Sequence, residues 1–169
     1  TDNPATIHDD AWERSLAVNA TGTMKVCRAA LPMLGKRGGA IVNIASVAAF
    51  NSGNGMASYS ASKAALIAYT RSIANAHGRD GVRANVVAPG WVRTPMSEAE
   101  MDEAAGLNGT TREVEFAKLE SGIGLGRIAD AAEIASCCLF LACDEASFVT
   151  GAVLVADGGG RVPAAHRAV

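Results

Sequence analysis

The chain has 169 residues, of which 49% are apolar, 19% charged and 5% aromatic, and its formal net charge at pH 7 is −2. This length suits one domain with its own core, and this composition is that of a globular protein rather than a disordered or fibrous one. The near-neutral charge and the scattered basic residues argue against nucleic-acid binding. No apolar run reaches the roughly 20 residues that span a bilayer, and no signal-peptide pattern opens the chain, so no membrane partner is expected.

The first half of the chain predicts a helix, a strand and a helix. Apolar residues at helical spacing follow two adjacent aspartates that can cap a helix, which we expect over residues 10–34. A glycine-rich segment with two basic residues ends that helix at residues 35–39. The run A-I-V-N-I-A at residues 40–45 predicts a short strand, which Ser46 follows. An alanine- and serine-rich helix is expected from residue 58 to about residue 77.

The second half predicts a strand, an excursion, a helix and a strand. The run V-R-A-N-V-V-A at residues 82–88 predicts a strand that a Pro-Gly pair terminates. Residues 94–126 are polar and contain glycines, which indicates a long, irregular surface excursion. Asp130 and Glu133 have the spacing of a capping box and open a helix. Residues 149–156 predict the last strand.

The order of these elements indicates the fold class. Strands that are separated by helices predict parallel crossover units, and hence an α/β layered domain with three strands and flanking helices. The sequence contains no internal repeat and no low-complexity segment. We therefore expect residues 1–169 to form a single domain.

The cysteines do not indicate a metal site. Three of the four lie in one apolar run, and no Cys-x-x-Cys pair is present, so small buried hydrophobes are the favoured interpretation for Cys27, Cys137, Cys138 and Cys143. We expect no metal ion. Thiols of this kind fit a reducing compartment, and we expect the protein in the cytoplasm.

Three residues in the middle of the chain have a spacing that suggests chemistry. Tyr59 and Lys63 are four residues apart on a predicted helix, so they share one face. Ser46 lies just past the carboxyl end of a predicted strand, where open α/β sheets place their ligand crevice. A phenol with its ordinary pKa of about 10 exchanges protons poorly at neutral pH, and a neighbouring ammonium favours the phenolate. A serine hydroxyl can hold a reacting oxygen on which charge develops.

These residues lie within motifs that resemble the short-chain dehydrogenase/reductase family. S-Y-S-A-S-K-A-A-L is similar to the catalytic helix of that family, and I-V-N-I-A-S to the strand that ends in its catalytic serine. V-R-A-N-V-V-A-P-G-W-V-R-T resembles its next strand and nicotinamide loop, and V-N-A-T-G the helix segment with its catalytic asparagine. The resemblance runs from about Trp12 to Gly160, in the family's order and spacing. It implies the carboxyl-terminal half of a Rossmann-like, doubly wound parallel sheet, as in 3-oxoacyl-(acyl-carrier-protein) reductase-like members.

The resemblance implies four catalytic residues. Tyr59 would be the general acid/base, which protonates a carbonyl oxygen in reduction or removes a hydroxyl proton in oxidation. Lys63 would favour the ionised form of Tyr59 and bind the nicotinamide ribose. Ser46 would orient the substrate oxygen, and Asn19 would hold a water that relays protons through Lys63. An asparagine inside a helix can also simply bond to nearby backbone.

The resemblance also implies a cofactor, NAD or NADP, and further residues that contact it. Besides Tyr59 and Lys63, Pro89 and Gly90 would come close to the nicotinamide, and Gly90 would permit that approach. The main chain of Val92 would bind the carboxamide, and Thr94 would hydrogen-bond the cofactor. Trp91 would line the pocket or cover a sheet edge.

The family's amino-terminal half is not matched. That half begins with a strand, a Gly-rich turn and a helix that grip the cofactor pyrophosphate, and residues 1–4 correspond to a segment after its fourth strand. The G-L-G-R-I-A run at residues 124–129 does not follow a predicted strand, so we reject it as a phosphate cradle. Without this half, the strand at residues 40–45 would become an exposed edge.

The function that follows from the resemblance is NAD(P)-dependent interconversion of a secondary alcohol and a ketone. A small-molecule alcohol or ketone and further copies of the chain, as a dimer or tetramer, are the expected partners. One alternative is a catalytically inactive truncated fragment that acts as an oligomerisation module through residues 10–34 and 58–77. Another is a lyase or epimerase that uses the same nicotinamide scaffold.

The substrate is expected to lie under residues 95–126. This segment would form a lid, and its mixture of Met96, Met101, Leu107 and Phe116 with acidic residues suggests an apolar pocket with a solvated outer face. A 3-oxoacyl thioester reductase and a secondary-alcohol, sugar or steroid dehydrogenase would all fit.

Overall fold

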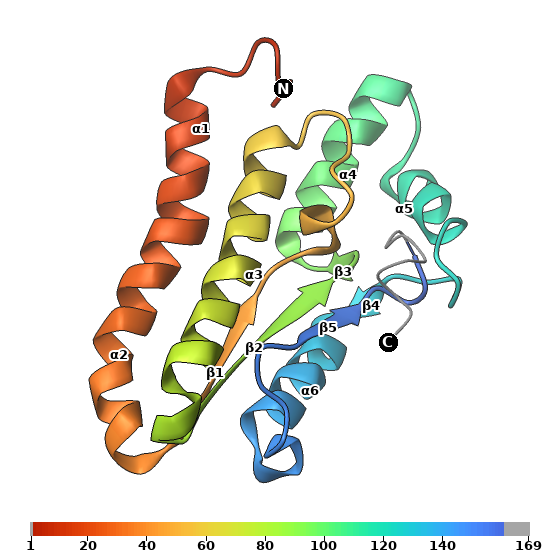
Figure 1. Ribbon diagram of the computed structural model, residues 1–169. Helices are drawn as coiled ribbons and strands as arrows, with labels where there is room; N and C mark the ends of the chain where they lie inside the picture. The colour runs from red at the N-terminus through yellow and green to blue at the C-terminus, as the bar shows by residue number, and fades with distance from the viewer. Residues whose placement is uncertain (1, 161–169) are drawn as a thin grey trace.

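The computed structural model describes residues 2–160 and contains a parallel sheet between helices (Figure 1). Its strand order is β1-β2-β5, with β1 at Gly39–Ile44, β2 at Val82–Pro89 and β5 at Val153–Ala156. Strand β1 pairs with β2 from Gly39↔Val82 to Ile44↔Val87, and β2 pairs with β5 from Val86↔Val153 to Pro89↔Ala156. The predicted α/β class with three parallel strands is confirmed.

Helices cover the two faces of this sheet. Side chains alternate across a strand, and Ala84, Val86 and Ala88 of β2 belong to apolar clusters shared with helix α3, Ala57–His77. The alternate residue Arg83 points the other way and donates to the carbonyls of Leu141 at 2.7 Å and Cys143 at 2.9 Å, at the end of helix α6, Ala131–Ala142. Helices α3 and α6 therefore pack on opposite faces of the sheet.

The predicted helix over residues 10–34 is interrupted. Helix α1 spans Asp9–Leu16 and helix α2 spans Thr23–Arg37, and Ala17–Gly22 between them form a π-helical turn. Four of the six residues in A-V-N-A-T-G, the valine, asparagine, threonine and glycine, are weak helix formers, and the asparagine side chain bonds to another helix. The prediction of one regular helix is wrong at this turn. Such π turns are frequent at functional sites.

The last strand is shorter than predicted. The sequence predicts a strand over residues 149–156, but β5 begins only at Val153, because the chain turns at Gly151, where φ is +73°. The amide of Asn85 in β2, which is fully buried, holds this turn. Its Nδ2 donates to the Val149 carbonyl at 2.8 Å, and its Oδ1 accepts from the Ala152 N–H at 3.0 Å.

Residues 94–126 are mostly helical, which corrects the prediction of an irregular excursion. Helix α4 spans Pro95–Asn108 and helix α5 spans Arg112–Glu120, and threonine side chains cap both at their amino ends. Met101, Phe116 and Ile128 form a buried cluster between them. The segment is polar on average, but this apolar cluster gives its helices a buried tertiary contact.

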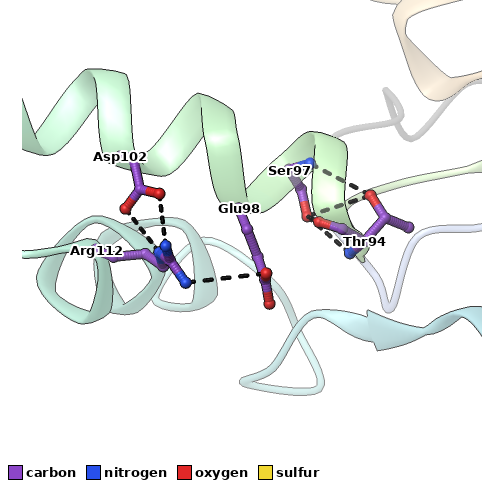
Figure 2. A network of polar contacts seen from close by, with 5 residues as sticks. All are labelled: Thr94, Ser97, Glu98, Asp102 and Arg112. Atoms are coloured by element: carbon purple, nitrogen blue, oxygen red, sulfur yellow. Dashed lines mark hydrogen bonds and ion pairs between the residues drawn. The ribbon is translucent and has the colours of Figure 1, made fainter.

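An arginine joins the two helices on the outside of this segment (Figure 2). Arg112 of α5 makes a bidentate contact with Asp102 of α4, at 2.7 Å through Nε and 2.5 Å through Nη2. Glu98, one turn earlier on α4, lies 3.9 Å from Arg112 Nη1. The short strands β3, Val92–Arg93, and β4, Ala129–Asp130, pair in parallel where the segment leaves and rejoins the domain.

The predicted capping box at the start of α6 is confirmed. Asp130 and Glu133 bond reciprocally, and Glu133 Oε2 accepts from the Asp130 N–H at 2.9 Å. Both carboxylate oxygens of Glu133 also accept from Arg127, at 2.7 Å each. The Arg127 guanidinium, together with the Asp130 N–H, lowers the pKa of Glu133 to about 2.

Folding stability should therefore fall in acid as Glu133 becomes protonated. Its pKa is depressed from 4.5 to about 2 in the folded chain, so between these values the unfolded chain binds more protons. The contribution of Glu133 is complete above pH 4.5 and is lost as the pH falls toward 2. In Glu133→Gln, urea unfolding measured from pH 6 to pH 2.5 should show a shallower loss than in the wild type. Parallel curves for the two proteins would contradict this assignment.

Strand β1 is an edge strand of the sheet that residues 2–160 form. Among these residues it pairs only with β2, and Ile44 at its carboxyl end is 42% exposed. In the same part of the chain, no helix is both long and apolar enough to cross a membrane.

Candidate active site

Tyr59 and Lys63 lie in the first two turns of α3, and both are half-buried. Lys63 Nζ lies 5.7 Å from the centroid of the Tyr59 ring and donates to the carbonyl of Ile44 at 2.9 Å. Burial lowers the pKa of Lys63 below its ordinary value of 10.5. The cation is thus held between the phenol ring and the carboxyl end of β1.

Ser46 lies two residues beyond the carbonyl that Lys63 contacts. It is the N-cap of a short 3₁₀ turn, Val47–Ala49, and its Oγ accepts from the Ala48 N–H at 3.2 Å. The hydroxyl hydrogen is not used in that bond. The preceding residue, Ala45, packs in a buried cluster with Ile67 of α3. Ser46 is therefore fixed at the end of β1, beside the helix that carries Tyr59 and Lys63.

Asn19 contacts the same helix through a serine. Asn19 Nδ2 donates to Ser62 Oγ at 3.0 Å, and Ser62 Oγ donates to the Tyr59 carbonyl at 2.7 Å. The Asn19 carbonyl accepts from Thr23 Oγ1 at 3.0 Å. The Asn19 side chain thus joins the π-helical turn to α3, rather than bonding to nearby backbone.

Ser62 is a site residue that the sequence analysis did not single out. Its side chain is fully buried, and it connects Asn19 to Tyr59. The available signal was its position inside S-Y-S-A-S-K, one residue before Lys63. Serine in a helix commonly returns its hydroxyl to a preceding carbonyl, so the sequence alone gives it a local explanation.

The predicted cofactor residues follow β2. Pro89 ends β2 opposite Ala156, and the Gly90 N–H donates to the Ala156 carbonyl at 2.9 Å. A Cβ at Gly90 would lie 2.9 Å from the Asp157 Cα, so the close approach of the chain after β5 requires glycine here. Packing against Asp157 therefore explains why glycine occupies position 90, independently of its predicted role in cofactor binding.

The other two predicted cofactor residues lie at the start of the helical segment. Val92 pairs with Ala129 between β3 and β4. Thr94 Oγ1 accepts from the Ser97 N–H at 3.3 Å and caps α4, and Ser97 Oγ returns a bond to the Thr94 carbonyl at 3.0 Å (Figure 2). Because β1 and β2 are parallel, Ser46 after β1 and Gly90 after β2 lie at the same edge of the sheet, and Val92 and Thr94 follow Gly90 within four residues.

The donor set suits the nicotinamide end of NAD(P). Lys63 has three N–H donors and uses one on Ile44, which leaves two for the hydroxyls of a ribose. Within residues 2–160, no G-x-G-x-x-G or G-x-G-x-x-A run joins a strand to a helix: the loop with Gly53 and Gly55 before α3 lacks the third position, and the G-L-G-R-I-A run lies between α5 and β4. The pyrophosphate end has no cradle among these residues. They also hold no cluster of three His, Cys, Asp or Glu side chains arranged for a metal ion.

Comparison with known proteins identifies the class to which this arrangement belongs. The model of the family described as enoyl-(acyl carrier protein) reductase matches residues 2–160. The meso-2,3-butanediol dehydrogenase of Serratia marcescens is 41% identical over 150 residues, which are 89% of this chain and 55% of that protein. The 3-oxoacyl-(acyl-carrier-protein) reductase of Thermotoga maritima is 37% identical, over 89% of this chain and 57% of that protein.

A solved structure agrees. The ligand-free aldohexose dehydrogenase of Thermoplasma acidophilum superposes with a TM-score of 0.88 at 31% identity, over 93% of this chain and 62% of that one. The chain belongs to the short-chain dehydrogenase/reductase family of oxidoreductases. It spans little more than half the length of the two curated relatives described above.

Proposed function

We propose that the chain carries the catalytic residues of an NAD(P)-dependent oxidoreductase that interconverts a secondary alcohol and a ketone. The observation that supports this most is the arrangement of Tyr59, Lys63 and Ser46 at the carboxyl end of β1, in a member of an oxidoreductase family. A phenol, an ammonium and a hydroxyl are the groups needed to exchange a proton with a substrate oxygen.

The proton transfer belongs to Tyr59. In reduction its hydroxyl gives a proton to the carbonyl oxygen of the substrate, and in oxidation its phenolate takes the hydroxyl proton. Lys63 favours the phenolate by its charge and binds the nicotinamide ribose, and Ser46 donates to the substrate oxygen. Bound NAD(P) gives or accepts the hydride. Asn19, through Ser62, holds the turn between Tyr59 and Lys63, and Pro89, Gly90, Val92 and Thr94 form the nicotinamide side of the site.

The alternative is an inactive fragment that serves as an oligomerisation module, and exposed apolar side chains favour it. Val18, Val26 and Met33 are 65%, 70% and 75% exposed and lie along one continuous helical rod, from the π-helical turn through α2. Apolar side chains that recur every seven or eight residues lie on one face of a helix, and such a face can pack against another protein. An active homo-oligomer in the cytoplasm would use the same surface, so nucleotide binding decides between the two functions.

Titration of the purified chain with NADH and NADPH, followed by fluorescence, tests the proposal, with the oligomeric state measured in parallel. We expect saturable binding that weakens about tenfold in Lys63→Met, because a hydrogen bond from a charged group is lost. Lys25→Met removes an exposed lysine of α2 and should leave the affinity unchanged. A folded oligomer that binds neither nucleotide would support the module instead.

A further inference from the structure

The amino end of α3 is held by a residue 56 positions earlier in the chain. Asp2 Oδ2 accepts from the Ser58 N–H at 2.7 Å and from the Ser58 hydroxyl at 2.9 Å, and the Tyr59 N–H lies 3.4 Å away. The Ala57 N–H donates to the Asp2 carbonyl at 3.2 Å. A single bridge also pairs Asp2 with Met56.

These contacts replace a cap that the local sequence lacks. The first N–H groups of a helix have no partner within the helix. The N-cap of α3 is Met56, which makes no capping bond with its side chain. A carboxylate from elsewhere in the chain satisfies these donors, and its negative charge is favourable at the positive end of the helix dipole.

We propose that Asp2 is a positioning residue for Tyr59, an inference that rests on the proposed function. The Tyr59 backbone is held on two sides: its N–H faces Asp2, and its carbonyl accepts from Ser62, which is bonded to Asn19. Asp2 thus fixes the turn from which the Tyr59 side chain departs. A displacement of about 1 Å at a reacting group can cost 10²-fold in rate. Loss of the Asp2 contacts is therefore expected to slow the proton transfer by Tyr59.

Steady-state kinetics of Asp2→Ala and Asp2→Asn test the proposal. The substrates tested are meso-2,3-butanediol, an aldohexose and a 3-oxoacyl thioester. The first two are assayed with the oxidised nucleotides and the thioester with the reduced ones. In Asp2→Ala we expect kcat to fall roughly 10- to 100-fold, with the KM for nucleotide within about twofold. Asp2→Asn keeps an acceptor oxygen and should recover most of kcat. Asp9→Ala removes an exposed aspartate of α1 and should change neither constant.

Amide hydrogen exchange of the 169-residue chain supplies a second measurement that needs no turnover. Exchange at Ser58 and Tyr59 should accelerate in Asp2→Ala, since Asp2 is the acceptor for both amides, and should not change in Asp9→Ala. Faster exchange with an unchanged kcat would overturn the positioning role and leave Asp2 as a structural cap. Unchanged exchange would overturn the anchor itself. If the wild-type protein shows no turnover, the proposed function is overturned, and this role with it. If the wild type is active and Asp2→Ala is equally active, only the positioning role is overturned.

Discussion

Replacing Tyr59 with phenylalanine is expected to lower kcat by about 10²- to 10⁴-fold, the range that a positioned general acid or base contributes. The substitution removes only the hydroxyl to which we assign the proton transfer. Lys63 keeps its bond to the Ile44 carbonyl, and Ser46 keeps its place at the end of β1. Nucleotide affinity should therefore change little. The measurement is kcat with the substrate panel, beside a fluorescence titration with NADH and NADPH.

The chain offers a matched control, because it contains two tyrosines, both on α3. Tyr69 is also half-buried, and its hydroxyl donates to the Met24 carbonyl at 3.4 Å, on the side of α3 that faces α2. Tyr69→Phe removes the same hydroxyl oxygen from the same helix. We expect kcat to stay within about twofold of the wild type, because Tyr69 faces α2 and lies away from the candidate site. Wild-type turnover in Tyr59→Phe would refute the acid/base assignment, and an equal loss in both variants would point to damage of the helix.

Replacing Asn85 with leucine is expected to destabilise the fold by about 2–6 kcal/mol. The substitution leaves two buried backbone groups, the Val149 carbonyl and the Ala152 N–H, without the partners they have now. Each such group costs about 1–3 kcal/mol when it is buried and unpaired. Because domains are stable by about 5–15 kcal/mol, this is a large fraction of the total. Urea unfolding, followed by circular dichroism, measures the change.

Asn75→Leu is the control for that experiment. Asn75 is exposed on α3, so the same substitution there should change the free energy of unfolding by no more than about 0.5 kcal/mol. A shift below about 1 kcal/mol in Asn85→Leu would mean that the turn before β5 finds other partners, and that the asparagine does not hold it.

The local pattern predicts those parts of the fold whose signal is local. The predicted bounds of strand β2 agree with the structure to within one residue, because the β-rich run V-R-A-N-V-V-A is ended by Pro-Gly. The capping box of α6 was found because it lies within four residues. The start of β5 was missed, since the turn at Gly151 is held by Asn85, more than 60 positions earlier in the chain. The local pattern does not predict helices α4 and α5, because Met101 and Phe116 are buried by tertiary contacts with Ile128 and the residues packed around it.

The candidate site divides in the same way. Spacing and resemblance point to Tyr59, Lys63 and Ser46, and the structure brings Lys63 to both the tyrosine ring and the end of β1. Ser62 and Asp2 were not selected, because their contacts join positions that are far apart in the chain. A single sequence contains no record of such pairs.

The parallel order β1-β2-β5 has a consequence for synthesis on the ribosome. Strand β2 ends at Pro89 and its neighbour β5 begins at Val153, so the 63 residues 90–152 must be added after β2 before β5 is made. At roughly 5–20 residues per second, this takes several seconds. Ser46, Tyr59 and Lys63 are all made before that interval, and for its duration the β5-facing side of β2 lies bare. The residues to which we assign the chemistry are thus translated before β5, the strand that completes that side of the sheet.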